Sequence, residues 1–297
     1  MNSRFSRCRI PGVFYIGLIV LGLIPSFNGF AAVWNITYPR ALNEGDLRNN
    51  YPVELLTLAL EKTGVRYQLL SSDRIMLQGK SLRQLRENRS VNVVWSMTDE
   101  QREKDLLPIR IPIFKGLIGL RVFLIHRDKQ REFNAVQSLA ALQRYVPVQG
   151  EDWPDTKILQ SNGFDVASAT EYLDNFAMLS RFQADFFPRS VVEVMSEVGM
   201  SGVDTDIVLE QNLAIQYPAA MYYFVNRANP TLAKLLETGL RRALEDGSFD
   251  ELFMQHYGGL IETFNLSNRR VFQLDNPLLS EQTPLNDSSL WIDVTND

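Results

Sequence analysis

Apolar residues recur with the helical period of 3.6 in the stretch Tyr51–Val65, where Val53, Leu56 and Leu60 share one face. Gly64 follows the last of these positions. Glycine readily adopts the left-handed backbone conformation that ends many helices. The pattern therefore predicts an amphipathic helix that stops at Gly64.

Short apolar runs surround this helix. Val33–Thr37 and Arg66–Leu70 predict strands on either side of it, Ser81–Asn88 predicts a short helix, and Val91–Trp95 predicts a third strand. Strands and helices that alternate in this order usually form a parallel sheet covered by helices. We therefore expect an α/β fold in which ligands bind at the carboxyl ends of the strands.

The pattern changes in the middle of the chain. Gly116–His126 predicts a long apolar strand, and a second α/β unit begins beyond it with Ser138–Tyr145 as a helix. Met221–Asn226 predicts another apolar strand. The segment Asn229–Gly258 then carries a leucine stripe of helical period, which Gly247 interrupts. Two α/β units in one chain are therefore expected.

The N-terminal residues do not fit either unit. Three arginines precede the apolar run Gly12–Phe27, and small residues follow it in Asn28–Ala32. This order predicts a signal peptide, residues 1–31, with cleavage after Ala31. The apolar run is short for a membrane span, which needs roughly 20 apolar residues, although an uncleaved anchor remains an alternative. We therefore expect a periplasmic protein.

Composition narrows the class of protein. The 297 residues are 45% hydrophobic and 22% charged, which is enough apolar material for a core. Cys8 is the only cysteine and would leave with the signal peptide, so we expect neither disulfides nor thiol chemistry. The net charge of −5 becomes −8 without the signal, because that segment holds three arginines and no acids. Such an acidic exported chain is a poor candidate for nucleic-acid binding.

One strand end carries candidate ligand-binding residues. Trp95 ends a predicted strand, and Ser96 and Thr98 follow it. Thr98 and Gln101 have the spacing of a helix capping box. Arg102 falls in the first helical turn, where a cation opposes the helix dipole unless it faces an anion. A guanidinium beside hydroxyls and free helix N–H groups makes a carboxylate receptor, with Trp95 as a wall.

This interpretation has an alternative, in which Arg102 pairs with Asp99 or Asp105 on the surface. A second candidate group, Trp153 and Asp155, follows another predicted strand end and could form the facing wall of a cleft. Trp153 could equally pack on its own domain.

A third candidate group, Arg189, Ser190 and Glu193, follows a short predicted strand. These residues either face the cleft, or Arg189 and Glu193 simply pair with each other. Tyr38 ends the first strand and is either a ligand contact or a packing residue.

Catalytic motifs are weak in this sequence. The two histidines, His126 and His256, lie far apart, and no cluster has metal-ligand spacing. No nucleophile elbow and no glycine-rich phosphate loop occurs. We therefore expect no enzyme activity, no metal and no cofactor.

Four segments resemble the family 3 extracellular solute-binding proteins, the periplasmic receptors of polar amino-acid ABC transporters. These segments are Tyr51–Leu70, Val91–Ile125, Ser138–Leu159 and Asn229–Gly258. The resemblance spans most of residues 33–258. It implies a type II periplasmic binding protein with two α/β lobes joined by two crossing strands, Leu117–Ile125 and Met221–Asn226. Lobe 1 would comprise residues 32–126 and 221–297, the latter with a C-terminal tail, and lobe 2 residues 127–220.

The resemblance also implies roles for single residues. Arg102 would hold a ligand carboxylate, with the loop Trp95–Thr98 adding contacts. Where the family has an aspartate for the α-ammonium group, this chain has Arg189-Ser190, and Glu193 could replace it only if turned inward. Pro39-Arg40 and the charged loop after them also differ from common transport receptors. The ligand would then be a dicarboxylate or another anion rather than an α-amino acid.

The leading hypothesis is a monomeric periplasmic receptor that clamps a small polar, carboxylate-bearing ligand and delivers it to an inner-membrane ABC permease. One alternative is a sensor that signals to a membrane kinase or cyclase. Another is a dehydratase-like enzyme with Glu193 or Asp155 as general acid or base. A scaffold that has lost its ligand is a further possibility.

Overall fold

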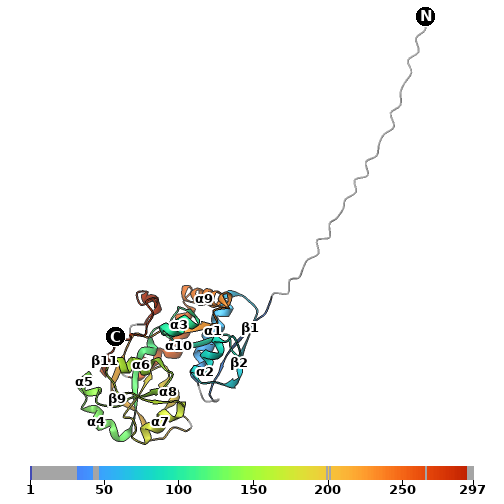
Figure 1. The fold of residues 1–297 in the computed structure, drawn as a ribbon. Coiled ribbons are helices and arrows are strands. Elements are labelled where there is room, and N and C mark those ends of the chain that lie inside the picture. Colours follow the sequence, from blue (N-terminus) through green and yellow to red (C-terminus); the bar gives the residue numbers. More distant parts are fainter. Residues whose placement is uncertain (2–31, 43–46, 199, 201, 265, 293–297) are drawn as a thin grey trace. The chain divides into compact units, whose positions relative to one another are not determined.

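The structure is a computed structural model that describes residue 1 and residues 32–42, 47–198, 200, 202–264 and 266–292 (Figure 1). The expected signal peptide falls outside these residues apart from its first, so its cleavage stays a prediction. Residues 33–297 form one folded unit, distinct from residues 1–32. Within the described part of the chain, no helix is long and apolar enough to cross a membrane.

The first lobe starts as the sequence predicts. Strands β1 (Trp34–Arg40) and β2 (Tyr67–Ile75) pair in parallel, and helix α1 (Asn50–Thr63) connects them. Gly64 caps α1 with a φ of 71°, which is the left-handed conformation expected for it. The predicted helix and its end are therefore confirmed.

The sheet does not continue as a parallel one. Strand β10 (Met221–Val225) pairs antiparallel with β3 (Val94–Met97) on one side and with β4 (Leu107–Ile109) on the other. The expectation of a purely parallel sheet is wrong here, because a strand from the far end of the chain returns between β3 and β4. This lobe also contains α2 (Gln78–Arg86), α3 (Glu100–Asp105), α9 (Pro230–Glu245) and α10 (Ser248–Thr263).

The second lobe is built on a sheet with the order β11-β9-β5-β8. Its strands are β5 (Leu120–His126), β8 (Phe187–Ser190), β9 (Ile207–Gln216) and β11 (Arg270–Gln273). A parallel pair, β6 (Val148–Gly150) and β7 (Ala167–Ala169), lies beside it. The helices of this lobe are α4 (Gln130–Asn134), α5 (Leu139–Leu142), α6 (Pro154–Ser161), α7 (Tyr172–Ser180) and α8 (Val194–Glu197).

The two strands expected to cross between the lobes each pair within a single sheet. The predicted strand Gly116–His126 begins with a 3₁₀ turn, Leu117–Gly119, and β5 itself pairs with β8 and β9 of lobe 2. This pairing favours a lobe boundary before β5 rather than after residue 126, although the lobe boundaries themselves stay a prediction. The second crossing is Tyr217–Ala220, between β9 and β10.

The C-terminal segment adds further connections. Strand β11 pairs in parallel with β9, so the chain enters the sheet of lobe 2 again after α10. The tail then returns to the first crossing, where the amide of Ile292 donates to the carbonyl of Lys115 over 2.9 Å. Trp291 covers Gly116, which has a φ of 81°. The C-terminal segment as far as Ile292 therefore packs against the first crossing.

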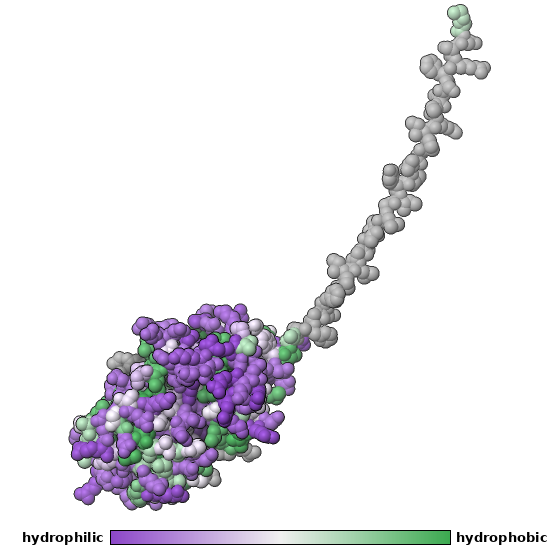
Figure 2. All heavy atoms as spheres, viewed as in Figure 1, coloured by the Kyte–Doolittle hydropathy of each residue, from purple (hydrophilic) through white to green (hydrophobic). Residues whose placement is uncertain are grey.

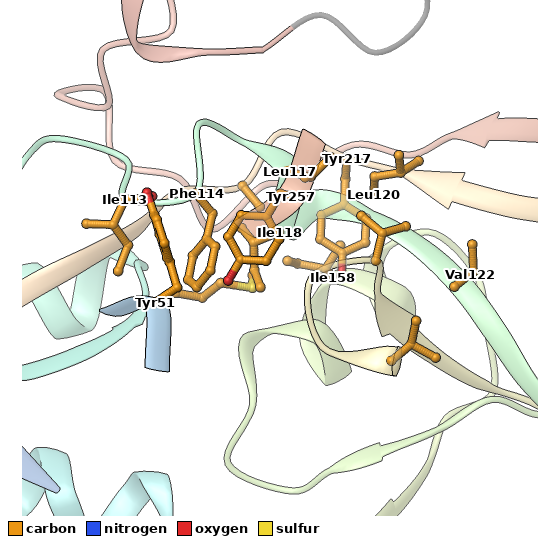
Figure 3. Close-up of a cluster of buried hydrophobic side chains, with 14 of the residues drawn as sticks. Tyr51, Ile113, Phe114, Leu117, Ile118, Leu120, Val122, Ile158, Tyr217 and Tyr257 are labelled. Atoms are coloured by element: carbon orange, nitrogen blue, oxygen red, sulfur yellow. The ribbon is translucent and has the colours of Figure 1, made fainter. Parts of the chain in front are cut away.

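One hydrophobic cluster extends through both lobes. Figure 3 shows Tyr51 and Phe114 beside Ile118, and Tyr217 and Ile158 further along the same row. Hydrophilic side chains predominate on the face shown in Figure 2, with scattered hydrophobic residues. The core thus lies beneath the crossing segments that position the site.

Candidate functional site

A cavity of about 250 Å³ lies between the two lobes. Lobe 1 contributes residues from the end of β1, the start of α2 and the end of β3. Lobe 2 contributes residues from β5, β8 and the N-terminal ends of α6 and α7. The position between two α/β lobes is a common place for a ligand site.

Arginine and acid side chains pair on the lobe 2 wall of this cavity. Arg189, on β8, is buried, and its Nε lies 2.8 Å from Glu197 Oε2, while its Nη2 lies 2.7 Å from Glu197 Oε1. The same Nη2 lies 3.1 Å from Glu193 Oε2. Arg189 and Glu193 therefore both line the cavity and also pair with each other, and their contact with a ligand stays a prediction.

The pKa values in this group follow from burial and pairing. Burial alone would raise the pKa of Glu197, but the charge and hydrogen bonds of Arg189, with smaller contributions from Arg48 and Tyr172, bring it below its ordinary value. For Arg189, burial lowers the pKa, but Glu193 and Glu197 together raise it well above the ordinary value. Both groups are therefore charged at neutral pH.

Arg121 forms the other half of this wall. It comes from β5, a strand that is apolar except for Arg121 and the terminal His126, and its Nη2 lies 2.6 Å from Asp155 Oδ1. Tyr217 donates a hydrogen bond to the same carboxylate. Burial lowers the pKa of Arg121, but Asp155, Tyr217 and Glu193 raise it above the ordinary value. Its Nε has no partner among the described residues, so one buried donor in the wall remains unused.

Trp153 lines the cavity, as one of its two sequence interpretations predicts. Its ring stacks on Phe187 with centroids 6.1 Å apart, and the guanidinium carbon of Arg189 lies 4.8 Å from the ring centroid. A Cβ at Gly150 would come within 2.6 Å of this ring. Gly150 therefore gives the indole the room it needs.

Arg102 has a different environment from the one expected. Its Nε lies 3.2 Å from Asp99 Oδ2, and its Nη1 donates to Ser96 Oγ at 2.5 Å and to the carbonyl of Met97 at 2.8 Å. Its Nη2 donates to the Gln78 side chain at 3.2 Å and to the carbonyl of Asp152 at 2.9 Å. A guanidinium has five N–H donors. The two terminal nitrogens make four hydrogen bonds here, and Nε faces the Asp99 carboxylate in an ion pair.

Neither interpretation of Arg102 matches this structure in full. Arg102 does not line the cavity and pairs with Asp99, as the alternative interpretation has it, but its side chain is only 12% exposed and does not lie on the surface. Burial lowers the pKa of Arg102, with Asp99, Asp155 and Asp152 opposing that effect. The contact of Arg102 with a ligand carboxylate therefore stays a prediction that would require these partners to rearrange.

The capping box predicted from Thr98 and Gln101 is wrong. Asp99 is the N-terminal cap of α3, and its carboxylate accepts from the amide of Arg102 over 2.7 Å. Aspartate is as good a cap as threonine, and the spacing alone did not separate them. Thr98 instead donates to Glu103 over 2.7 Å.

The other residues that the sequence proposed for the site differ in burial and in whether they line the cavity. Trp95 lines the cavity and is half-buried, whereas Ser96 and Thr98 are buried behind it. Tyr38 packs against Trp95 with ring centroids 5.9 Å apart and does not reach the cavity. The cavity therefore brings together Trp95, Trp153, Arg189 and Glu193, but not Tyr38, Ser96, Thr98 or Arg102.

The described residues make several contacts between the lobes beside the cavity, and three of them are as follows. One is the hydrogen bond from Arg102 to Asp152. Another is a close approach at Gly79 in α2, where a Cβ would overlap the carboxylate of Asp152. In the third, the guanidinium carbon of Arg48 lies 4.3 Å from the ring centroid of Tyr172. The lobes are thus in contact on both sides of the cavity.

The cavity offers no obvious catalytic machinery. Asp155 and Glu193, the two candidates for a general acid or base, are each paired with Arg121. Among the residues that the structure describes, no group of histidine, cysteine and acid side chains could hold a metal ion. The arrangement is suited to holding a charged or polar molecule by ion pairs and aromatic faces.

Sequence reasoning missed several contributors to the site, among them Arg48, Arg121, Tyr172 and Glu197. Only Arg121 gave a usable signal, because a lone arginine inside an apolar strand needs a buried acid. Arg48, Tyr172 and Glu197 lie in segments of ordinary polarity, which gave no signal of this kind.

No protein-family model matches the chain, and no curated protein sequence matches it. Solved structures do match its fold. One is a histidine kinase sensor domain with similarity to periplasmic binding proteins, at 16% identity and a TM-score of 0.55, which covers 76% of this chain and 96% of that one.

Two solved binding proteins have similar TM-scores. A Salmonella typhimurium periplasmic binding protein specific for arginine is 11% identical, with a TM-score of 0.56 over 75% of this chain and 99% of that one. A probable amino-acid ABC transporter extracellular-binding protein from Bacillus subtilis is 16% identical, with a TM-score of 0.56 over 76% and 99%. The chain therefore has the two-lobed α/β fold of periplasmic binding proteins, as predicted from its sequence.

Proposed function

We propose that this protein is a periplasmic solute receptor that closes its two lobes over a small polar ligand. The cavity between the lobes carries this proposal, because charged and aromatic side chains from both lobes line it. Its volume, about 250 Å³, lies just below the range typical of ligand pockets, about 300–1,000 Å³. A small ligand therefore suits it better than a peptide or a polymer.

The environment of the arginines refines the expected ligand. The sequence favoured an anion, because Arg102 and Arg189 were expected to face carboxylates of the ligand. Arg189 and Arg121 are already paired with acids, and the donors of Arg102 are engaged within the protein. We therefore propose a polar ligand without requiring that it be an anion.

Transfer of the ligand to an inner-membrane ABC permease is the proposed role, with the protein acting as a monomer. Signalling to a membrane kinase is the second candidate, and one observation favours it: a histidine kinase sensor domain is as similar in fold as the transport receptors are. Deleting the gene separates the two roles. Lost uptake of the ligand supports transport, and retained uptake with a lost response to the ligand supports sensing.

A thermal-shift screen against amino acids, dicarboxylates and amines tests the binding function. A ligand at 100 times its dissociation constant stabilises the folded state by about 2.7 kcal/mol. We expect Trp95→Ala, in the cavity wall, to abolish the shift, and Trp34→Ala, a half-buried tryptophan outside the cavity, to preserve it. A shift that survives Trp95→Ala unchanged would place the ligand elsewhere.

A further inference from the structure

The two walls of the cavity carry opposite charge. On lobe 2, two arginines face five carboxylates, a net charge of −3 for that wall. The acids are Glu151, Asp152, Asp155, Glu171 and Glu193, and the arginines are Arg121 and Arg189. On lobe 1, the described lining residues include Arg40 and Arg48 and no acid. Lobe 1 therefore presents cations to an acidic wall.

The inner part of the lobe 2 wall is also short of positive charge. Arg121 and Arg189 balance only two of the three acids with which they pair, which are Asp155, Glu193 and Glu197. Four of these five side chains are buried, and that of Glu193 is 21% exposed. An excess charge in such a place is costly unless a counter-charge reaches it.

Arg48 of lobe 1 supplies that counter-charge. Its guanidinium carbon lies 4.3 Å from the ring centroid of Tyr172, which is within the range of a cation–π contact. Its Nη1 lies 3.9 Å from Glu197 Oε1. The Tyr172 hydroxyl donates to the same carboxylate over 2.6 Å, so the ring is held in place beneath the guanidinium. An aromatic face beside a buried acid is a receptor for a cation.

We propose that Arg48 is an internal occupant of a cation subsite in lobe 2, and that a ligand bearing a guanidinium or primary ammonium group displaces it. The inference rests on the proposed function, because the same lobes must open to admit the ligand. Arg48 is tethered to lobe 1, so it competes with the ligand at a high effective concentration. Ligand affinity is then reduced by the fraction of molecules in which Arg48 fills the subsite.

Replacing Arg48 tests the inference directly. In Arg48→Met the subsite loses its internal cation but lobe 1 keeps a side chain of similar length. Isothermal titration with butylguanidinium should then show an affinity about tenfold or more above that of the unmodified protein. The neutral isostere butylurea should gain nothing, because it lacks the charge that the subsite requires.

Arg83→Met is the matched control. Arg83 lies exposed on α2 of lobe 1, outside the cavity, and its loss changes the net charge equally. Affinity for butylguanidinium should change less than about twofold in this variant, since exposed charges are screened by salt. An equal gain in both variants would overturn the inference, because the effect would then follow net charge.

Two further results would also overturn it: an unchanged affinity in Arg48→Met, or no binding of butylguanidinium to either protein. Neither result would remove the proposed function, which depends on the ligand screen with the unmodified protein. The ligand screen can also fail while butylguanidinium binds tightly to Arg48→Met. That result would support the cation subsite and show that the screen contained the wrong classes of ligand.

Discussion

The two lobes build their walls of the cavity in different ways. In lobe 2, Arg121 and Arg189 extend from sheet strands into acids that are fixed by neighbouring elements, and the whole group is buried. In lobe 1, Arg48 comes from a short 3₁₀ turn and Arg102 from the first turn of α3. Both of these reach across to lobe 2.

This difference between the lobes implies that lobe 2 holds the charged group in place and that lobe 1 takes part in closure. The ion pairs of Arg121 with Asp155 and of Arg189 with Glu197 lie within lobe 2, so we expect them to persist when the lobes separate. The lobe 1 arginines gain some of their contacts only when the lobes meet. Substitutions in the lobe 2 ion pairs should therefore change the stability of the fold. Substitutions of the lobe 1 arginines should change the closure of the lobes.

The largest expected effect is that of Arg189→Met. Removing this guanidinium leaves Glu197 and Glu193 near each other without their main partner, and breaking a buried ion pair from one side costs about 3–5 kcal/mol. Urea unfolding measures the loss. The exposed control Arg83→Met should stay within about 0.5 kcal/mol, and a similar loss in both variants would contradict a special role for the buried pair.

The second effect is a pH dependence that Glu197 creates. Folding lowers the pKa of this carboxyl, so its contribution to stability is complete above the unfolded value of about 4.3 and is lost as the pH falls through the folded value. Between pH 5 and 3, Glu197→Gln should flatten the fall in unfolding free energy by up to about 1.4 kcal/mol per pH unit. Parallel curves for the two proteins would show that Glu197 titrates normally.

A smaller effect is expected for Arg102→Met. Its contacts lie at the edge of the cavity, and a hydrogen bond typically contributes about 0.5–1.5 kcal/mol, so we expect a loss of about 1–2 kcal/mol in unfolding free energy. The loss should be well below that of Arg189→Met. If Arg102→Met were the more damaging variant, lobe 1 would hold the more important buried charge.

The smallest effect on stability, and the most specific for closure, is that of Gly79→Ala. The added methyl group would overlap the carboxylate of Asp152 in the other lobe, so the lobes must separate slightly. Each lobe remains intact, and unfolding free energy should stay within about 1 kcal/mol of the unmodified protein. Small-angle scattering should show a larger radius of gyration for Gly79→Ala than for Gly259→Ala, whose methyl group meets nothing within 4 Å.

Local patterns predicted the parts of this fold that depend on local chemistry. Helix α1 (Asn50–Thr63) ends before Gly64, which adopts a positive φ, and the periodicity and the glycine were both visible in the sequence. The tail is different. Strand β11 pairs with β9, and periodicity does not reveal which distant strand a short segment will join.

The candidate site shows the same limit. Trp153 and Glu193 were found because they follow predicted strand ends, where ligands bind in α/β folds. The pairing of Arg121 with Asp155 could not be read in this way, since the two residues belong to different elements and meet only through packing. For Arg102, the sequence indicated two possible partners, a ligand carboxylate and Asp99. It did not show that five acceptor groups of the protein itself would surround the guanidinium.

The most direct test is a measurement of the distance between the lobes by pulsed electron paramagnetic resonance. Spin labels at Arg83→Cys in α2 and Lys157→Cys in α6, both exposed, would report it in a Cys8→Ser background. The account predicts a short-distance population in the ligand-free protein, its loss in Arg48→Met, and its return when butylguanidinium is added to that variant. One unchanged distance in all three samples would contradict the claim that a cation, either Arg48 or a ligand, draws the lobes together.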